Sequence, residues 1–367
     1  MVGPLQHIEA KALVYSEGAR VYSMANLATG AFQSGRGTRP LADQRKTIYR
    51  RRAFLDHLAC FTPADLRKSS TSPLDLEAYR WTLLAQGDSW FSKAAATQNT
   101  HTNVLQEMVF KEPACAINCA AAGLSLTHVV DLVSNPDFIA LLTRPDAPVW
   151  DGVLLSMGGN DLIAAAQIPG LTPAGHEIPL HLRLLRRPAE WGPPSQGVAR
   201  YFSEPGWETL AAYLRTNIRH LLSLRDQGPS AGKPVFMHCY AVPMPRPAGA
   251  DDAGPWLFPT LKAYALPSAD WAAISRLMVF HLAQLLKSLA ADKQEFPNLH
   301  VFDSTAVPLA PANQASTSSS GDWHNEIHLN HSGSFKIARA WAEPVEMALA
   351  GIKPAEPPKK RGRAAKT

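Results

Sequence analysis

Cysteine is scarce in this chain, and the cysteine pattern of a metal site is missing. The 367 residues contain four cysteines, at positions 60, 115, 119 and 239. Cys115 and Cys119 have no matching second pair at a metal-ligand spacing, and the four lie largely on apolar runs. We therefore expect buried free thiols and no cysteine-bound metal.

Long hydrophobic runs are also missing. No stretch reaches the roughly 18 consecutive apolar residues that a membrane span requires. The N-terminal residues show no positively charged region followed by an apolar core and a small-residue cleavage site. These absences predict a cytoplasmic protein, although delivery by a specialised secretion machine would leave no such signal.

Outside residues 353–367 the chain has no excess charge of either sign. It has 36 Lys and Arg against 31 Asp and Glu, and residues 353–367 hold six of the former and one of the latter, so residues 1–352 carry 30 of each. A neutral body argues against an extended nucleic-acid surface. The basic tail, residues 351–367, has little apolar surface to bury and is predicted to be disordered. Its charge suits contact with nucleic acid or anionic surfaces, and simple solubilisation is the interpretation that we favour.

The chain does have the composition of a soluble globular protein, with 46% hydrophobic and 18% charged residues. Its length allows a large core, in one α/β domain with insertions or in two domains. Apolar runs alternate with amphipathic segments, which predicts a parallel sheet covered by helices on both faces. The expected strands are residues 79–88, 114–120, 151–157, 234–240 and 299–303. The expected helices are residues 103–110, 129–142, 206–225, 268–293 and 332–349.

Residues 76–350 form the predicted domain, and residues 1–75 form an N-terminal extension to which the sequence assigns no fold. Two insertions rich in proline and glycine, residues 162–205 and 241–267, follow strand ends. Two interpretations of them are open. They form the walls or lid of a site, with Trp256, Leu257 and Phe258 as an apolar platform, or they cap the edge of the sheet.

The most informative stretch is residues 83–91 (LLAQGDSWF). An apolar run ends at a Gly-Asp-Ser turn, as a buried parallel strand does when it delivers a serine to the carboxyl edge of a sheet. Gly87 permits the tight turn, and Ser89 is expected at a helix N-terminus, where free N–H groups favour negative charge. Taken alone, such a turn is more often plain turn chemistry.

Three further stretches place polar residues or glycine at strand ends. Residues 117–123 (INCAAAG) end in glycine, residues 153–161 (VLLSMGGND) end in a glycine turn with an amide, and residues 322–330 (DWHNEIHLN) precede a helix-like segment. In order, the four stretches resemble the Ser, Gly, Asn and His blocks of the SGNH, or GDSL, hydrolase superfamily. The resemblance covers roughly residues 80–345. It implies a flavodoxin-like, three-layer α/β/α sandwich with a mostly parallel five-stranded sheet, and it implies no metal and no cofactor.

The resemblance also implies roles for individual residues. Ser89 is expected to be the nucleophile, and His328 is expected to take its proton and return it to the leaving group. The expected oxyanion hole combines the backbone N–H groups of Ser89 and Gly123 with the side-chain amide of Asn160.

One position departs from the family pattern. The family has an aspartate three residues before the histidine, where this chain has Asn325. An asparagine accepts the imidazole N–H but adds no negative charge to stabilise the imidazolium. Asp322, six residues before His328, supplies that charge if the turn folds back, and Glu326 lies two residues before the histidine. The sequence leaves open which of these residues orients the ring.

Other histidines near these motifs are weaker candidates. His324 and His331 have metal-like spacings to His328, but no carboxylate or cysteine pattern accompanies them, so no metal is expected. His238 and Tyr240 end the fourth expected strand, where lining a pocket and burial in the core are both open.

The sequence thus predicts an esterase- or lipase-type hydrolase that cleaves a small-molecule or lipid carboxylic ester through an acyl-serine intermediate. The aromatic residues of the 241–267 insertion favour an apolar acyl group. Two alternatives are a carbohydrate O-acetylesterase and a non-catalytic binding protein that keeps the fold, the latter motivated by Asn325. The sequence carries no signal for an oligomeric state.

Overall fold

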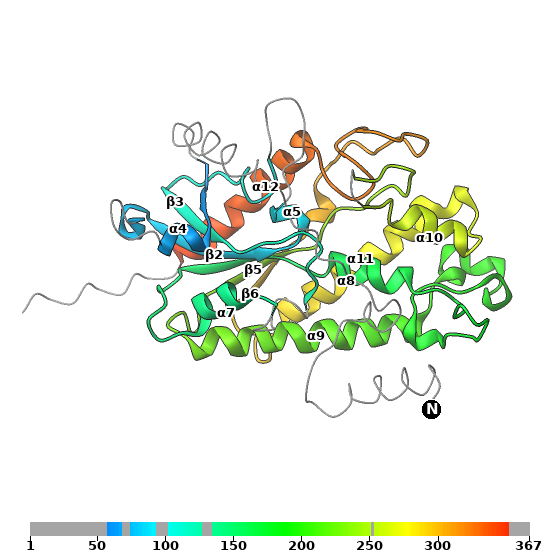
Figure 1. Cartoon of the computed structure of the whole chain (residues 1–367), viewed down its shortest axis with the longest axis horizontal. Coiled ribbons are helices and arrows are strands. Elements are labelled where there is room, and N and C mark those ends of the chain that lie inside the picture. The colour runs from blue at the N-terminus through cyan, green and yellow to red at the C-terminus, as the bar shows by residue number, and fades with distance from the viewer. Residues whose placement is uncertain (1–56, 68–73, 93–101, 127–133, 251–252, 352–367) are drawn as a thin grey trace, which may run out of the picture.

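A six-stranded parallel sheet runs through the molecule, with helices on both faces (Figure 1). The computed structural model describes residues 57–67, 74–92, 102–126, 134–250 and 253–351. The predicted three-layer α/β/α sandwich is confirmed. In spatial order the strands are β1 (Ala59–Phe61), β3 (Ala114–Asn118), β2 (Trp81–Gly87), β4 (Gly152–Ser156), β5 (Val235–His238) and β6 (Leu299–Phe302).

The number of strands differs from the prediction, six instead of five. The additional strand, β1, is three residues long and pairs in parallel with β3, with Cys60 opposite Ala116. So short a strand shows no pattern in the sequence, and it lies in the part of the chain to which no fold was assigned. The other five strands are those predicted, and their ranges agree within a few residues.

The strand order explains where a ligand site should lie. The five predicted strands run β3-β2-β4-β5-β6, the flavodoxin-like order. Because the chain moves from β2 to β3 on one side and then to β4 on the other, the order reverses at β2 and β4. In open α/β sheets, ligands bind beyond the carboxyl ends of the strands at such a point. Ser89 follows β2 and Asn160 follows β4.

The two strands at this point are buried on both faces, as near-continuous apolar runs in parallel sheets are. Leu83, Leu84 and Ala85 of β2 are fully buried, and so are the residues of β4 between positions 153 and 155. Helix α9 (Glu204–Gln227) packs against α7 (Pro136–Thr143) and α11 (Trp271–Ala291), and Figure 1 shows α9 and α12 (His331–Ala350) on opposite faces of the sheet. The helices are α4 (Pro63–Arg67), α5 (Ser89–Ser92), α7 (Pro136–Thr143), α8 (Gly159–Gln167), α9 (Glu204–Gln227), α10 (Leu257–Ala263), α11 (Trp271–Ala291) and α12 (His331–Ala350).

The helix predicted at residues 103–110 is wrong. The chain there makes one turn, closed by the bond from the Glu107 N–H to the Asn103 carbonyl, and Val109 then forms an antiparallel bridge with His57. The helices predicted at 206–225, 268–293 and 332–349 are confirmed by α9, α11 and α12.

Both predicted insertions carry little regular structure. The first residues of the 162–205 insertion belong to α8, and the remainder contains the short 3-10 segments η3 (Leu180–Leu182), η4 (Pro188–Glu190) and η5 (Pro194–Tyr201). The 241–267 insertion carries α10. None of the described helices is both long enough and apolar enough to span a membrane. Most of the N-terminal extension, and the basic tail from residue 352, lie outside the described residues.

Candidate active site

Ser89 is the first residue of α5, directly beyond the carboxyl end of β2. Its side chain is nearly buried, with 5% of its surface exposed. Gly87 is needed for this turn because β4 comes very close: a Cβ at position 87 would lie 2.8 Å from the Cβ of Ser156. The Asp88 carboxylate accepts the Trp90 N–H at 2.9 Å, which satisfies one of the free N–H groups at the start of the helix.

His328 comes from the loop before α12 and meets Ser89 from 239 residues away in the sequence. Its Nε2 atom lies 2.6 Å from the Ser89 Oγ atom. The Trp90 indole N–H donates to the Ile327 carbonyl at 3.1 Å, which ties the helix that begins at Ser89 to the loop that carries His328. Two adjacent contacts therefore join the segment that carries Ser89 to the loop that carries His328.

Asn325 is the residue that contacts the other ring nitrogen. Its Oδ1 atom lies 3.0 Å from His328 Nδ1 and also accepts the backbone N–H groups of Ile327 and His328, at 3.1 and 2.9 Å. Backbone N–H groups can only donate, so this atom is the amide oxygen. An oxygen acceptor requires a proton on Nδ1, which leaves the lone pair of Nε2 facing the Ser89 hydroxyl.

Asp322 lies on the far side of the same loop and forms an ion pair. Its carboxylate lies 2.6 Å from the Lys336 ammonium on α12 and accepts the Ala310 N–H at 2.6 Å. Burial raises the pKa of Asp322, but the hydrogen bonds from Lys336, Ser332 and the Ala310 N–H, with the charge of Lys336, together outweigh it, and the pKa lies below its ordinary value. The structure therefore brings Asn325, and not Asp322, to the histidine.

Glu326 points away from the imidazole, into the 241–267 insertion. Its buried carboxylate accepts the backbone N–H groups of Arg246, Leu257 and Phe258, at 3.2, 2.9 and 2.7 Å, and also that of Trp256. Burial raises the pKa of this carboxyl above its ordinary value. Glu326 thus fixes the insertion to the histidine loop.

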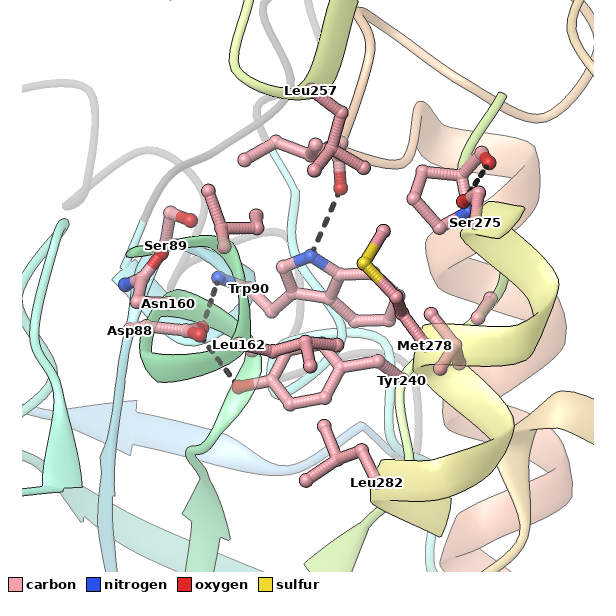
Figure 2. Close-up of a pocket in the computed structure, with 16 residues that line it drawn as sticks. Asp88, Ser89, Trp90, Asn160, Leu162, Tyr240, Leu257, Ser275, Met278 and Leu282 are labelled. Atoms are coloured by element: carbon pink, nitrogen blue, oxygen red, sulfur yellow. Dashed lines mark hydrogen bonds between the residues drawn. The ribbon is translucent and has the colours of Figure 1, made fainter. Parts of the chain in front are cut away.

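Asn160 and Gly123 follow the two strands that flank β2, which are β4 and β3. Asn160 is the second residue of α8, and its amide donates to the Leu124 carbonyl at 2.8 Å through one of its two N–H bonds. Gly123, directly before Leu124, has a φ of 80°, a conformation that favours glycine. Ser89 and Asn160 line one cavity (Figure 2).

Asp161 supports the site, although it was not among the predicted site residues. It belongs to the 153–161 stretch. Its buried carboxylate accepts the Leu126 N–H at 3.1 Å and the Tyr213 hydroxyl at 2.9 Å. Burial raises its pKa to about 6. Asn160 and Asp161 thus hold the Gly123 loop at two points, and the adjacency of the two residues in the 153–161 stretch was the available signal.

A buried polar network lies beneath Ser89. The Tyr240 hydroxyl donates to Asp88 at 2.5 Å, and Ser156 donates to the other carboxylate oxygen at 3.1 Å. His238 Nδ1 accepts the Tyr240 N–H, so its Nε2–H donates to the Ser156 hydroxyl at 2.9 Å. Burial raises the pKa of Asp88 to about 6 and lowers that of His238 to about 3. His238 is therefore a neutral core residue that supports the turn carrying Ser89.

Tyr240 is also a wall of the cavity. Its φ of 63° is strained for a bulky residue, and bonds to its backbone hold it there, including one from the Ser304 hydroxyl to its carbonyl at 2.7 Å. A Cβ at position 159 would lie 2.8 Å from the Tyr240 ring, so Gly159 permits the close packing of this ring under α8. The cavity is lined by Asp88, Ser89, Trp90, Gly159, Asn160, Leu162, Ile163, Tyr240, Ala241, Pro243, Leu257, Ser275, Met278, Val279, Leu282 and Ile327.

No protein-family model and no curated protein matches the sequence. Among solved structures, the chain is similar to an aryl esterase from M. smegmatis, at 13% identity over 73% of this chain and 99% of that one, with a TM-score of 0.39. It is similar to a phospholipase A1 from Streptomyces albidoflavus, at 16% identity over 74% and 98% of the two chains, with a TM-score of 0.37. An acetylxylan esterase from Geobacillus stearothermophilus matches at 13% identity over 72% and 94%, with a TM-score of 0.35. At these identities and TM-scores the likeness decides neither the family nor the activity of this chain.

The site geometry itself has clear chemical consequences. A serine hydroxyl faces an unprotonated imidazole nitrogen, and an amide lies in the same cavity. Such a pair can activate the hydroxyl as a nucleophile. Among the described residues, no group of three or more His, Cys, Asp or Glu is arranged to hold a metal ion.

Proposed function

We propose that this chain is a serine ester hydrolase of the SGNH, or GDSL, type, which cleaves a carboxylic ester through an acyl-serine intermediate. The observation that carries the proposal is the contact of 2.6 Å between His328 Nε2 and Ser89 Oγ, made by a ring whose Nδ1–H is held by Asn325. The order of the four sequence motifs supports the same proposal.

In the first half of the reaction, the Ser89 oxygen attacks the ester carbonyl as its proton passes to His328 Nε2. The carbonyl oxygen becomes negative, and the N–H groups of Ser89 and Gly123 and the free N–H of the Asn160 amide stabilise it. His328 then gives the proton to the leaving alkoxide, the ester C–O bond breaks, and the acyl group remains on Ser89.

In the second half, a water molecule attacks the acyl-serine and gives its proton to His328. The bond between the acyl carbon and the Ser89 oxygen then breaks, the serine recovers the proton from His328, and the carboxylic acid leaves. Asn325 keeps the ring in one orientation throughout, as a neutral acceptor without the charge of a carboxylate. An asparagine has the same position in the Cys-His-Asn sites of papain-like proteases.

The full chain is expected to hydrolyse p-nitrophenyl esters, and the substitution Asn160→Ala is expected to lower kcat by about 10²–10³-fold, because one donor to the oxyanion is lost. The measurement is the release of p-nitrophenol under saturating ester. Asn217→Ala is the matched control, since this buried amide on α9 also donates to one carbonyl, that of Tyr213 at 2.9 Å. Equal rates for both variants, or no hydrolysis by the native chain, would rule the proposal out.

A further inference from the structure

The cavity beside Ser89 has a reactive side and an apolar side. Figure 2 shows Asp88, Ser89 and Asn160 on one side and residues of α11 on the other, with the Trp90 and Tyr240 rings between them. The α11 side is lined by Met278, Val279 and Leu282, and Leu162 and Leu257 close it from α8 and α10. An ester carbonyl at Ser89 therefore places one substituent against hydrocarbon.

The polar groups that line the apolar side already have partners within the protein. The Ser275 hydroxyl donates to the Pro243 carbonyl at 2.7 Å, the Trp90 indole donates to Ile327, and the Tyr240 hydroxyl donates to Asp88. A sugar hydroxyl placed here would exchange its bonds with water for contacts with carbon, which costs free energy. The lining thus selects a hydrocarbon group and works against a polyol.

The free space is limited. The cavity holds about 50 Å³, where a single water needs on the order of 10–15 Å³ by the same kind of measure. This is room for a short acyl chain, and a long lipid chain would have to leave the cavity.

The wall that limits this space is fixed in place. Leu257 stands at the start of α10, and its N–H, with those of its neighbours, is held by the buried Glu326 carboxylate. The Trp256 ring packs edge-on against the His328 ring, with centroids 5.3 Å apart. Because Glu326 lies between Asn325 and His328 in the chain, the hydrogen bonds to its carboxylate tie the wall of the cavity directly to the loop that carries the histidine.

We propose that this cavity is the acyl-binding pocket, and that the substrate is an ester of a short apolar carboxylic acid. The inference rests on the proposed function and adds the substrate class to it. The pocket lies between α8, α10 and α11, and Leu282 and Met278 form the end that meets the tip of the chain.

A series of p-nitrophenyl esters from acetate to decanoate tests the substrate class with the full native chain. We expect kcat/KM to rise about three- to four-fold for each added methylene while the chain fills the pocket, since burial contributes about 0.8 kcal/mol per methylene. Beyond that length it falls. An acetylated xylo-oligosaccharide is expected to be a poorer substrate than the best ester of the series. A maximum at acetate, a flat series, or a preference for the acetylated sugar overturns the proposal.

The substitution Leu282→Ala tests the position of the pocket. Shortening this side chain deepens the end of the cavity, so the preferred ester should shift to a longer chain by two or more methylenes. Leu286→Ala is the matched control, because Leu286 lies one turn further along α11, is equally buried and does not line the cavity. Met278→Ala is a second test variant with the same expected shift. The proposal fails if Leu282→Ala or Met278→Ala keeps the native chain-length profile, as the control Leu286→Ala is expected to do.

The two proposals can fail separately. A chain that hydrolyses esters with no dependence on acyl length keeps the proposed function and loses the pocket. A folded chain that hydrolyses no ester of the series overturns both.

Discussion

Replacing Ser89 by alanine is expected to lower kcat for ester hydrolysis by a factor on the order of 10⁶, the effect seen when the catalytic serine is removed from a serine protease. The reason is that Ser89 carries the covalent intermediate in the proposed reaction, and its hydroxyl is the one that lies 2.6 Å from His328 Nε2. The expected KM changes little, because alanine removes one oxygen from the cavity wall. The measurement is steady-state hydrolysis of the best p-nitrophenyl ester.

Ser92→Ala is the matched control for this experiment. Ser92 belongs to the same short helix, and its hydroxyl donates to the Asp88 carbonyl at 3.0 Å. Its loss should cost some stability and leave the rate close to native. If Ser89→Ala and Ser92→Ala have the same kcat, Ser89 is not the nucleophile.

Replacing His328 by glutamine is expected to lower kcat by a similar factor, on the order of 10⁶. A glutamine amide cannot take the hydroxyl proton, although it fills much of the space of the ring. Because Ser89 and His328 act as one unit, the double variant should be no slower than either single variant. Additive losses in the double variant would show that the two residues act independently, against the mechanism proposed here.

Three further substitutions in the same loop show how specific the loss of kcat is to His328. His324→Gln makes the same exchange four residues earlier, at a half-buried ring that the mechanism does not use, and should leave kcat close to native. Asn325→Ala removes the acceptor of the His328 Nδ1–H, and its kcat should lie between those of His324→Gln and His328→Gln. A loss for Asp322→Ala larger than that for Asn325→Ala would instead assign the orienting role to Asp322.

The sheet and the gathering of the motifs could be predicted because they depend on local sequence. Buried parallel strands such as β2 and β4 are continuous apolar runs, and the residues that follow them share one edge of the sheet. The apolar runs therefore predict that Ser89 and Asn160 follow strands, and in the structure they follow β2 and β4. The three-residue β1 was missed because it has too few residues for a pattern.

The choice between Asn325, Asp322 and Glu326 could not be made from the sequence, because distant residues decide it. Asp322 forms an ion pair with Lys336 on α12, and the Glu326 carboxylate accepts backbone N–H groups between positions 246 and 258. The Asn325 side-chain oxygen accepts the backbone N–H groups of Ile327 and His328, and the tight turn that results brings this oxygen to the His328 ring. Three neighbouring acceptors in one loop thus have three different partners.

The most direct measurement is labelling of the native full chain with a fluorophosphonate, followed by mass spectrometry of its peptides. The reagent reacts with a serine only where a base activates the hydroxyl. Modification of Ser89 in the native chain, lost in His328→Gln, is the result we predict. A folded native chain that stays unmodified, or that is modified at a different serine, would contradict the assignment of Ser89 and His328 as an activated pair.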